Sequence, residues 1–94
     1  MEPTPVRIVF RHEKSANYSD PVTAVFADGD ARERGYRSCY SHVGQHSSCS
    51  RSWFTSNTRP ATPEEYAPLL AELQRVGYAV TVVPRVNWSV PNAA

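Results

Sequence analysis

The sequence predicts a small α+β domain in which one helix packs on one face of a small, mostly antiparallel sheet of three to five strands. Short apolar runs rich in β-branched residues predict the strands, and one well-marked amphipathic helix precedes the last of them. The 94 residues suffice for a single domain with a modest core. The expected order is β-β-β-α-β, with residues 1–86 forming the domain and residues 87–94 a C-terminal tail to which Trp88 offers a docking group.

The first two strands are predicted over Val6–Phe10 and Val22–Phe26, which are apolar and β-branched. The polar stretch between them contains Asp20-Pro21 and is typical of a loop, so the two strands form a hairpin with a long connection. Asp28-Gly29 is a turn dipeptide that ends the second strand.

A third strand is predicted over residues 36–42. Its alternation places Tyr36, Ser38, Tyr40 and His42 on one face and Arg37, Cys39 and Ser41 on the other. Residues 43–45 then turn the chain, residues 46–54 return as a polar arm, and residues 56–60 are expected to be loop.

The helix has the clearest signals in the chain. Thr62 is a capping residue, Pro63 suits the first helical position and Glu65 completes a capping box. Gly77 ends the helix, and Pro68 is expected to bend it. One apolar stripe follows at helical spacing: Tyr66, Leu69, Leu70, Leu73 and Val76. The last strand is predicted over residues 78–83.

Composition and charge exclude several classes of protein. No apolar run approaches the roughly 20 residues of a membrane helix, and the first residues lack the regions of a signal peptide. We therefore expect an intracellular protein whose two cysteines are thiols or metal ligands. A net charge of +1 argues against both a DNA mimic and a strong nonspecific DNA binder.

Arginine is concentrated in the middle of the chain. Residues 31–59 contain five arginines and one glutamate, a net charge of 5 − 1 = +4, so the rest of the chain sums to 1 − 4 = −3. Charge clusters of this kind are commonly solvated loops. The alternative is an anion-binding surface, because the guanidinium fork matches phosphate and carboxylate.

The motif CYSHVGQHSSC, residues 39–49, contains four residue types that zinc prefers: Cys39, His42, His46 and Cys49. On a helix these four would spread over about 15 Å. In a regular hairpin with residues 43–45 as its loop, Cys39 faces Cys49 and His42 faces His46, on opposite faces of the ribbon. The four converge only if the arms are bulged, so a zinc-stabilised binding module is kept as an alternative and no cofactor is favoured.

The same motif permits a disulfide or catalysis. Cys39 and Cys49 would lie near bridging distance, although the cytoplasm would keep them reduced. His42 and His46 are candidates for acid and base in a small His-dependent phosphodiester hydrolase. No carboxylate lies nearby in the sequence to orient them, so an enzyme is the second alternative.

Binding is the interpretation we favour. His42, Gln45 and His46 can hydrogen-bond a base or an amide, and Tyr40 and Trp53 can stack on one. A phosphate would be held by Arg37, Arg51 and Arg59. The competing interpretation is that Tyr36, Tyr40 and Trp53 belong to the core. In an extended arm the adjacent Trp53 and Phe54 would leave one aromatic ring exposed as a contact.

HVGQH, residues 42–46, and TRPATPEEYAPLLAEL, residues 58–73, together resemble a family of small uncharacterised proteins of bacteriophages, prophages and mobile elements. The resemblance covers about half of the chain. In that family the histidine motif recurs, whereas cysteines are not a dependable part of it. The resemblance implies the cytoplasm of a bacterial host and an accessory role, such as inhibition of a host enzyme or of antiviral defence.

These observations together predict a non-enzymatic binding protein that forms a homodimer. Its partner would be a host protein or a nucleotide or nucleic-acid ligand, engaged through the HVGQH turn and its flanking arginines.

Overall fold

The computed structural model of the protein describes residues 2–14, 21–28, 36–41 and 45–88, apart from the side chains of residues 45 and 46. Six strands lie in these residues: β1 (Thr4–Glu13), β2 (Val22–Phe26), β3 (Tyr36–Ser41), β4 (Gln45–Ser50), β5 (Thr58–Pro60) and β6 (Tyr78–Val82). Two helices accompany them: α1 (Arg51–Asn57) and α2 (Pro63–Val76).

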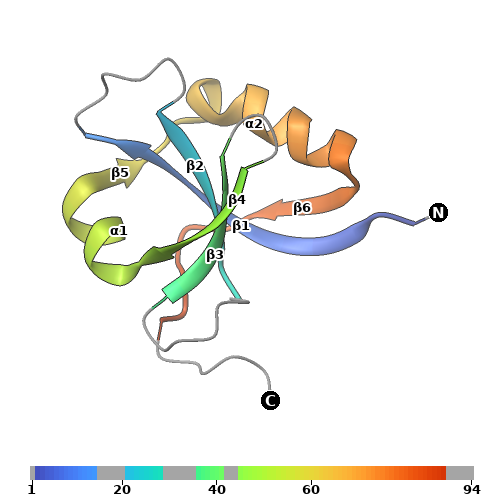
Figure 1. Ribbon diagram of the computed structural model, residues 1–94. Coiled ribbons are helices and arrows are strands. Elements are labelled where there is room, and N and C mark those ends of the chain that lie inside the picture. The colour runs from blue at the N-terminus through green and yellow to red at the C-terminus, as the bar shows by residue number, and fades with distance from the viewer. Residues whose placement is uncertain (1, 15–20, 29–35, 42–44, 89–94) are drawn as a thin grey trace.

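The strands form one sheet with the order β4-β3-β2-β1-β5, and β6 also pairs with β1 (Figure 1). The pairing of β1 with β6 is parallel, and the other described pairs are antiparallel. This confirms the predicted α+β class and the mostly antiparallel sheet. It also adds two strands, β4 and β5, and the helix α1 to the predicted order β-β-β-α-β.

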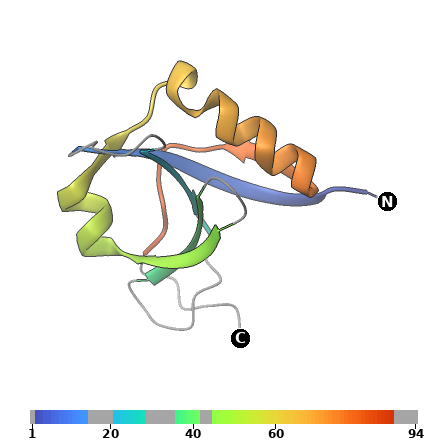
Figure 2. The ribbon, with the colours of Figure 1, turned by 45° about the horizontal axis from the view of Figure 1, so that its top comes forward.

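The sheet curls, so that α2 covers its outer face while α1 and the C-terminal segment enclose its inner face (Figure 2). Each face has its own core. The helix-side core contains Ile8, Phe10, Ala24, Tyr40, Leu69 and Leu73. The inner core contains Val9, Val25, Ala27, Cys39, Cys49, Phe54 and Trp88. Alternation along β1 explains the division, because successive side chains of a strand point to opposite faces.

The helix α2 begins and ends where the sequence predicts. The Oγ1 of Thr62 accepts a hydrogen bond from the amide of Glu65 at 3.3 Å, and the Glu65 carboxylate accepts one from the Thr62 amide at 2.8 Å. Gly77 adopts φ 124°, a conformation that favours glycine, and its amide donates to the Leu73 carbonyl. Val76 departs from the predicted stripe: it lies in the last turn, beyond the buried residues, and is 53% exposed.

The stretch between residues 45 and 60 corrects the sequence prediction. Residues 51–57 form α1 in place of an extended arm, because the Oγ of Ser50 caps the first turn by accepting from the Trp53 amide at 3.1 Å. Helical geometry buries Phe54 and half-buries Trp53, so neither is the exposed ring expected of an extended arm. The predicted loop at 56–60 contains β5, which pairs with β1.

The segment after β6 returns to the inner face of the sheet. The Val83 amide donates to the Ile8 carbonyl, and the Asn87 amide donates to the Ala27 carbonyl at 3.3 Å. Trp88 reaches the inner core and packs edge-on against Phe54, with ring centroids 5.2 Å apart. The docking group that the sequence suggested for the tail is therefore in place.

Tyr40 and Glu72 make a polar contact at the helix-side core. The Tyr40 hydroxyl donates to Oε2 of Glu72 at 2.6 Å, and both residues are buried. A buried carboxylate that loses a donor pays a desolvation penalty, because the lost bond is not replaced by water. This contact links β3 to α2 across the core.

We expect Tyr40→Phe to lower the free energy of unfolding by about 1–2 kcal/mol, because the substitution removes this donor and keeps the ring. Urea unfolding followed by circular dichroism measures the change. Tyr66→Phe is the matched control, since Tyr66 stacks on Phe10 through its ring at 4.3 Å, and its effect should stay within about 0.5 kcal/mol. Equal effects of the two substitutions would contradict the role of the hydroxyl.

Candidate functional site

The structure separates the residues that the sequence proposed as one site. His42 lies outside the described residues. Gln45 and His46 are the first residues of β4, and their side chains also lie outside the described part of the structure. Tyr40 is buried in the helix-side core, where its ring is covered by α2 and does not offer a stacking surface.

The hairpin of β3 and β4 has a different register from the one predicted. Tyr40 pairs with His46, and Cys39 pairs with Ser47, whereas the sequence analysis opposed Cys39 to Cys49. Each described residue of β3 thus pairs two positions earlier in β4 than predicted, and the last described pair is Ser41 with Gln45. Cys39 and Cys49 therefore lie diagonally across the ribbon on one face, and both join the inner core.

Arg59 is occupied by a carboxylate. Its guanidinium donates to both oxygens of Glu65, at 2.8 and 2.7 Å, in the forked geometry that arginine favours. His12 approaches the same carboxylate, with Nε2 3.5 Å from Oε2. The hydrogen bonds from Arg59, aided by the Thr62 amide, lower the pKa of Glu65 to about 2. Arg59 thus holds the start of α2, and a ligand phosphate would have to compete with Glu65.

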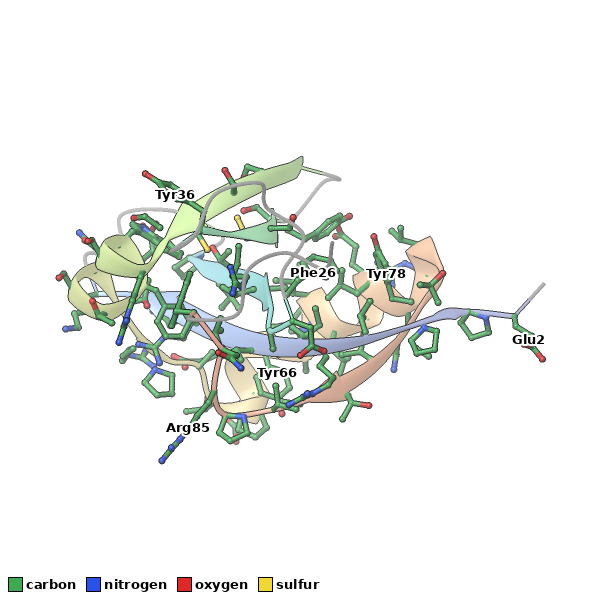
Figure 3. The ribbon with its side chains drawn as sticks, turned by 90° about the horizontal axis from the view of Figure 1, so that it is seen from below. Glu2, Phe26, Tyr36, Tyr66, Tyr78 and Arg85 are labelled. Atoms are coloured by element: carbon green, nitrogen blue, oxygen red, sulfur yellow. The ribbon has the colours of Figure 1, made fainter. Side chains whose placement is uncertain are left out.

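Arginines from three distant parts of the chain meet around a cavity of about 470 Å³. Arg7 comes from β1, Arg51 begins α1, and Arg85 follows β6 and points outward from the C-terminal segment (Figure 3). We call this the arginine cavity, and its lining is completed by Ala27, Asp28, Val86, Asn87 and Trp88. Within the part of the chain that the structure describes, neither Arg51 nor Arg85 makes an ion pair.

The one carboxylate in the lining of the arginine cavity is weakly held. Asp28 Oδ1 lies 3.2 Å from Arg7 Nη1, and the two side chains are 63% and 57% exposed. Exposed ion pairs contribute about 0–1 kcal/mol, because water screens them. A phosphate can therefore exchange with Asp28 on Arg7 at little cost.

A buried arginine holds the wall of this cavity. Arg37 donates to the carbonyls of Tyr36 and Asn87, and its guanidinium lies 5.8 Å from the centroid of the Trp88 ring. The sequence proposed Arg37 as a direct phosphate contact. The structure instead places it behind Asn87 and Trp88, where it positions the wall and adds positive charge beneath it.

A second cavity, of about 410 Å³, opens at the ribbon of β3 and β4. We call it the cysteine pocket, and it is lined by Glu13, Thr23, Tyr36, Cys39, Ser41, Ser47, Ser48, Cys49, Ser50 and Trp53. The Sγ of Cys39 lies 3.1 Å from the Oγ of Ser47. Trp53, a predicted ligand contact, thus borders this pocket rather than the arginine cavity.

The two thiols polarise each other. A hydrogen bond from Cys49, with further hydrogen bonds from Ser47, lowers the pKa of Cys39 despite its burial. The same thiol–thiol contact, with burial, raises the pKa of Cys49. Cys39 is therefore the thiol that ionises first, and Cys49 is the proton donor that stabilises it.

Sequence reasoning missed Arg7 and Arg85. Arg7 is a single charge within the first predicted strand and Arg85 a single charge after the last one, and nothing in their local pattern sets them apart from solvated surface residues. The curl of the sheet brings them to Arg51. Of the proposed phosphate contacts, only Arg51 lines the cavity itself.

The chain matches no family model, no curated protein and no solved structure. None of the helices in the described residues is long and apolar enough to cross a bilayer.

Metal binding by the Cys/His motif of residues 39–49 stays a prediction. The described His, Cys, Asp and Glu side chains form no group of three that could hold a metal ion. Because His42 and the His46 side chain lie outside them, the zinc and hydrolase alternatives stay predictions, as does the homodimer.

The pKa of Glu65 gives a test of the contacts at the start of α2. Because the folded value of about 2 lies below the ordinary 4.5, this carboxylate stabilises the fold above pH 4.5, and its contribution is lost as the pH falls toward 2. We expect an NMR titration to find this depressed value. Arg59→Gln should return it toward 4.5, whereas Arg75→Gln, on the last turn of α2, should not. An ordinary pKa in the unsubstituted protein would contradict the forked contact.

Proposed function

We propose that the protein is a non-enzymatic binding protein whose arginine cavity holds a phosphate-bearing ligand of nucleotide size. The observation that carries the proposal is that Arg7, Arg51 and Arg85, from three distant parts of the chain, all line one cavity. Gathering guanidinium groups is costly unless anions join them, since like charges repel, and among the described residues only Arg7 has a carboxylate partner here, the exposed Asp28. A phosphate with three donors around it satisfies that requirement.

The size and lining of the cavity support a nucleotide rather than a bare ion. Its volume of about 470 Å³ falls within the roughly 300–1,000 Å³ typical of small-molecule sites. Val86 and Trp88 add apolar and aromatic surface next to the charged groups. Such a mixture suits a ligand with a charged end and a flat, less polar end.

Hydrogen bonds within the protein fix the wall of the arginine cavity in the absence of a ligand. The Asn87 amide is bonded to the Ala27 carbonyl, and Arg37 bonds the Asn87 carbonyl. A pre-organised site loses less conformational entropy on binding. This favours sequestration, in which a small protein removes a ligand from solution without altering it.

The resemblance to proteins of phages and mobile elements supplies a biological setting for this activity. Sequestration of a nucleotide signal would inhibit a host enzyme or an antiviral defence that depends on that signal. A host protein as the partner is the competing form of the proposal.

Isothermal titration calorimetry with ATP and with inorganic phosphate, at low ionic strength, tests the proposal. We expect ATP to bind more tightly than phosphate, and Arg51→Gln and Arg85→Gln each to weaken ATP binding about tenfold, because each removes a charge-assisted contact. Added salt should weaken binding, and less steeply in either variant.

Arg75→Gln is the matched control, since Arg75 is exposed on α2, which covers the other face of the sheet. It should leave ATP affinity unchanged. Mass spectrometry of the nucleotide after incubation should find it intact. Absence of ATP binding, or equal affinity in all the variants, would exclude the arginine cavity as the site, and hydrolysis would favour the enzyme.

A further inference from the structure

Cys39 and Cys49 form a pair that the proposed function does not use. They are 4% and 6% exposed, and the hydrogen bond between their side chains connects adjacent strands of the curled sheet. Both are free thiols. Two thiols held this near each other on adjacent strands are candidates for oxidation to a disulfide.

The register of the hairpin determines what kind of disulfide this pair can form. Diagonal neighbours in a regular antiparallel ladder have Cα atoms roughly 7–8 Å apart, whereas disulfides typically need about 4.4–6.8 Å. Closing the bond across Cys39 and Cys49 therefore requires β3 and β4 to shift toward each other. A disulfide formed with such strain is more readily reduced than a relaxed structural one.

The cysteine pocket gives a small oxidant access to the pair. Both cysteines line it, and four serines, Thr23 and Glu13 supply polar groups that can hydrogen-bond a peroxide. The Oγ of Ser47 lies 3.1 Å from the Sγ of Cys39, within hydrogen-bond distance of the thiol. Buried thiols without such an opening are inert.

We infer that the cysteine pocket is a site of reversible thiol oxidation by hydroperoxides, in which Cys39 is oxidised first and Cys49 closes the disulfide. The lowered pKa of Cys39 supports this order, because the thiolate is the nucleophile.

The reaction takes two steps. The Cys39 thiolate attacks the terminal oxygen of a hydroperoxide, the O–O bond breaks, and the leaving alkoxide takes up a proton to become an alcohol. Cys39 is then a sulfenic acid, oxidised by two electrons. Cys49 attacks that sulfur with loss of its own proton, the S–O bond breaks, and water leaves as the disulfide forms.

Intact-mass spectrometry of the reduced protein, treated with hydrogen peroxide, tests the inference. We expect a loss of two hydrogen atoms per chain that dithiothreitol reverses. Cys49→Ser should stop at the sulfenic acid and be labelled by dimedone at Cys39. The Cys39→Ser variant should be labelled only weakly by dimedone. Circular dichroism of both variants checks that they fold.

Ser47→Ala tests the site while leaving both cysteines in place. It removes the hydroxyl beside Cys39, so we expect oxidation to slow about fivefold, the equivalent of one hydrogen bond. Ser48→Ala is the matched control, because Ser48 lines the same pocket with no hydrogen bond to Cys39 in the described structure, and its rate should not change.

Two results would overturn the inference. One is a protein that resists peroxide at concentrations that fully oxidise free glutathione. The other is oxidation that yields only disulfides between chains, which non-reducing electrophoresis detects. Equal dimedone labelling of the two single variants would contradict the assigned order of oxidation.

Discussion

The hydrogen bonding of β1 on both of its edges is the constraint on which the rest of the structure depends. Its ten residues pair with β2 on one side and with β5 and β6 on the other. Ile8, Val9 and Phe10 at its centre are almost fully buried, because both faces of the strand are covered. A strand in this position explains why a short chain builds two cores rather than one.

The curl around β1 gives the inner face an unusual content of polar groups. Arg11 lies over the Phe54 ring at 4.1 Å and donates to both oxygens of Thr58, and burial lowers its pKa. Arg37 donates to backbone carbonyls on the same side. Positive charge held near the inner core favours anions at its surface, and both cavities open beside that core.

Local signals predicted the elements that are stabilised locally. Thr62, Pro63 and Glu65 contact each other within one turn, so their spacing was enough to locate the start of α2. Val22–Phe26 is a strand within the limits that its composition predicts. The short elements α1 and β5 escaped prediction, because seven and three residues contain little periodicity and depend on contacts with β1. The predicted hairpin register was also wrong, because each described pair of β3 and β4 is offset by two residues and the local sequence does not fix this offset.

The sequence by itself determined the α+β class, the helix with its caps, the main strands and the types of residue available for binding. These depend on patterns among neighbouring residues, which tertiary contacts did not override. Only the tertiary structure decided which of those residues meet. It joined Arg7, Arg51 and Arg85, buried Tyr40 beneath α2, and turned Cys39 and Cys49 onto one face. Such distances follow from the curl and register of the sheet, for which the local sequence contains no signal.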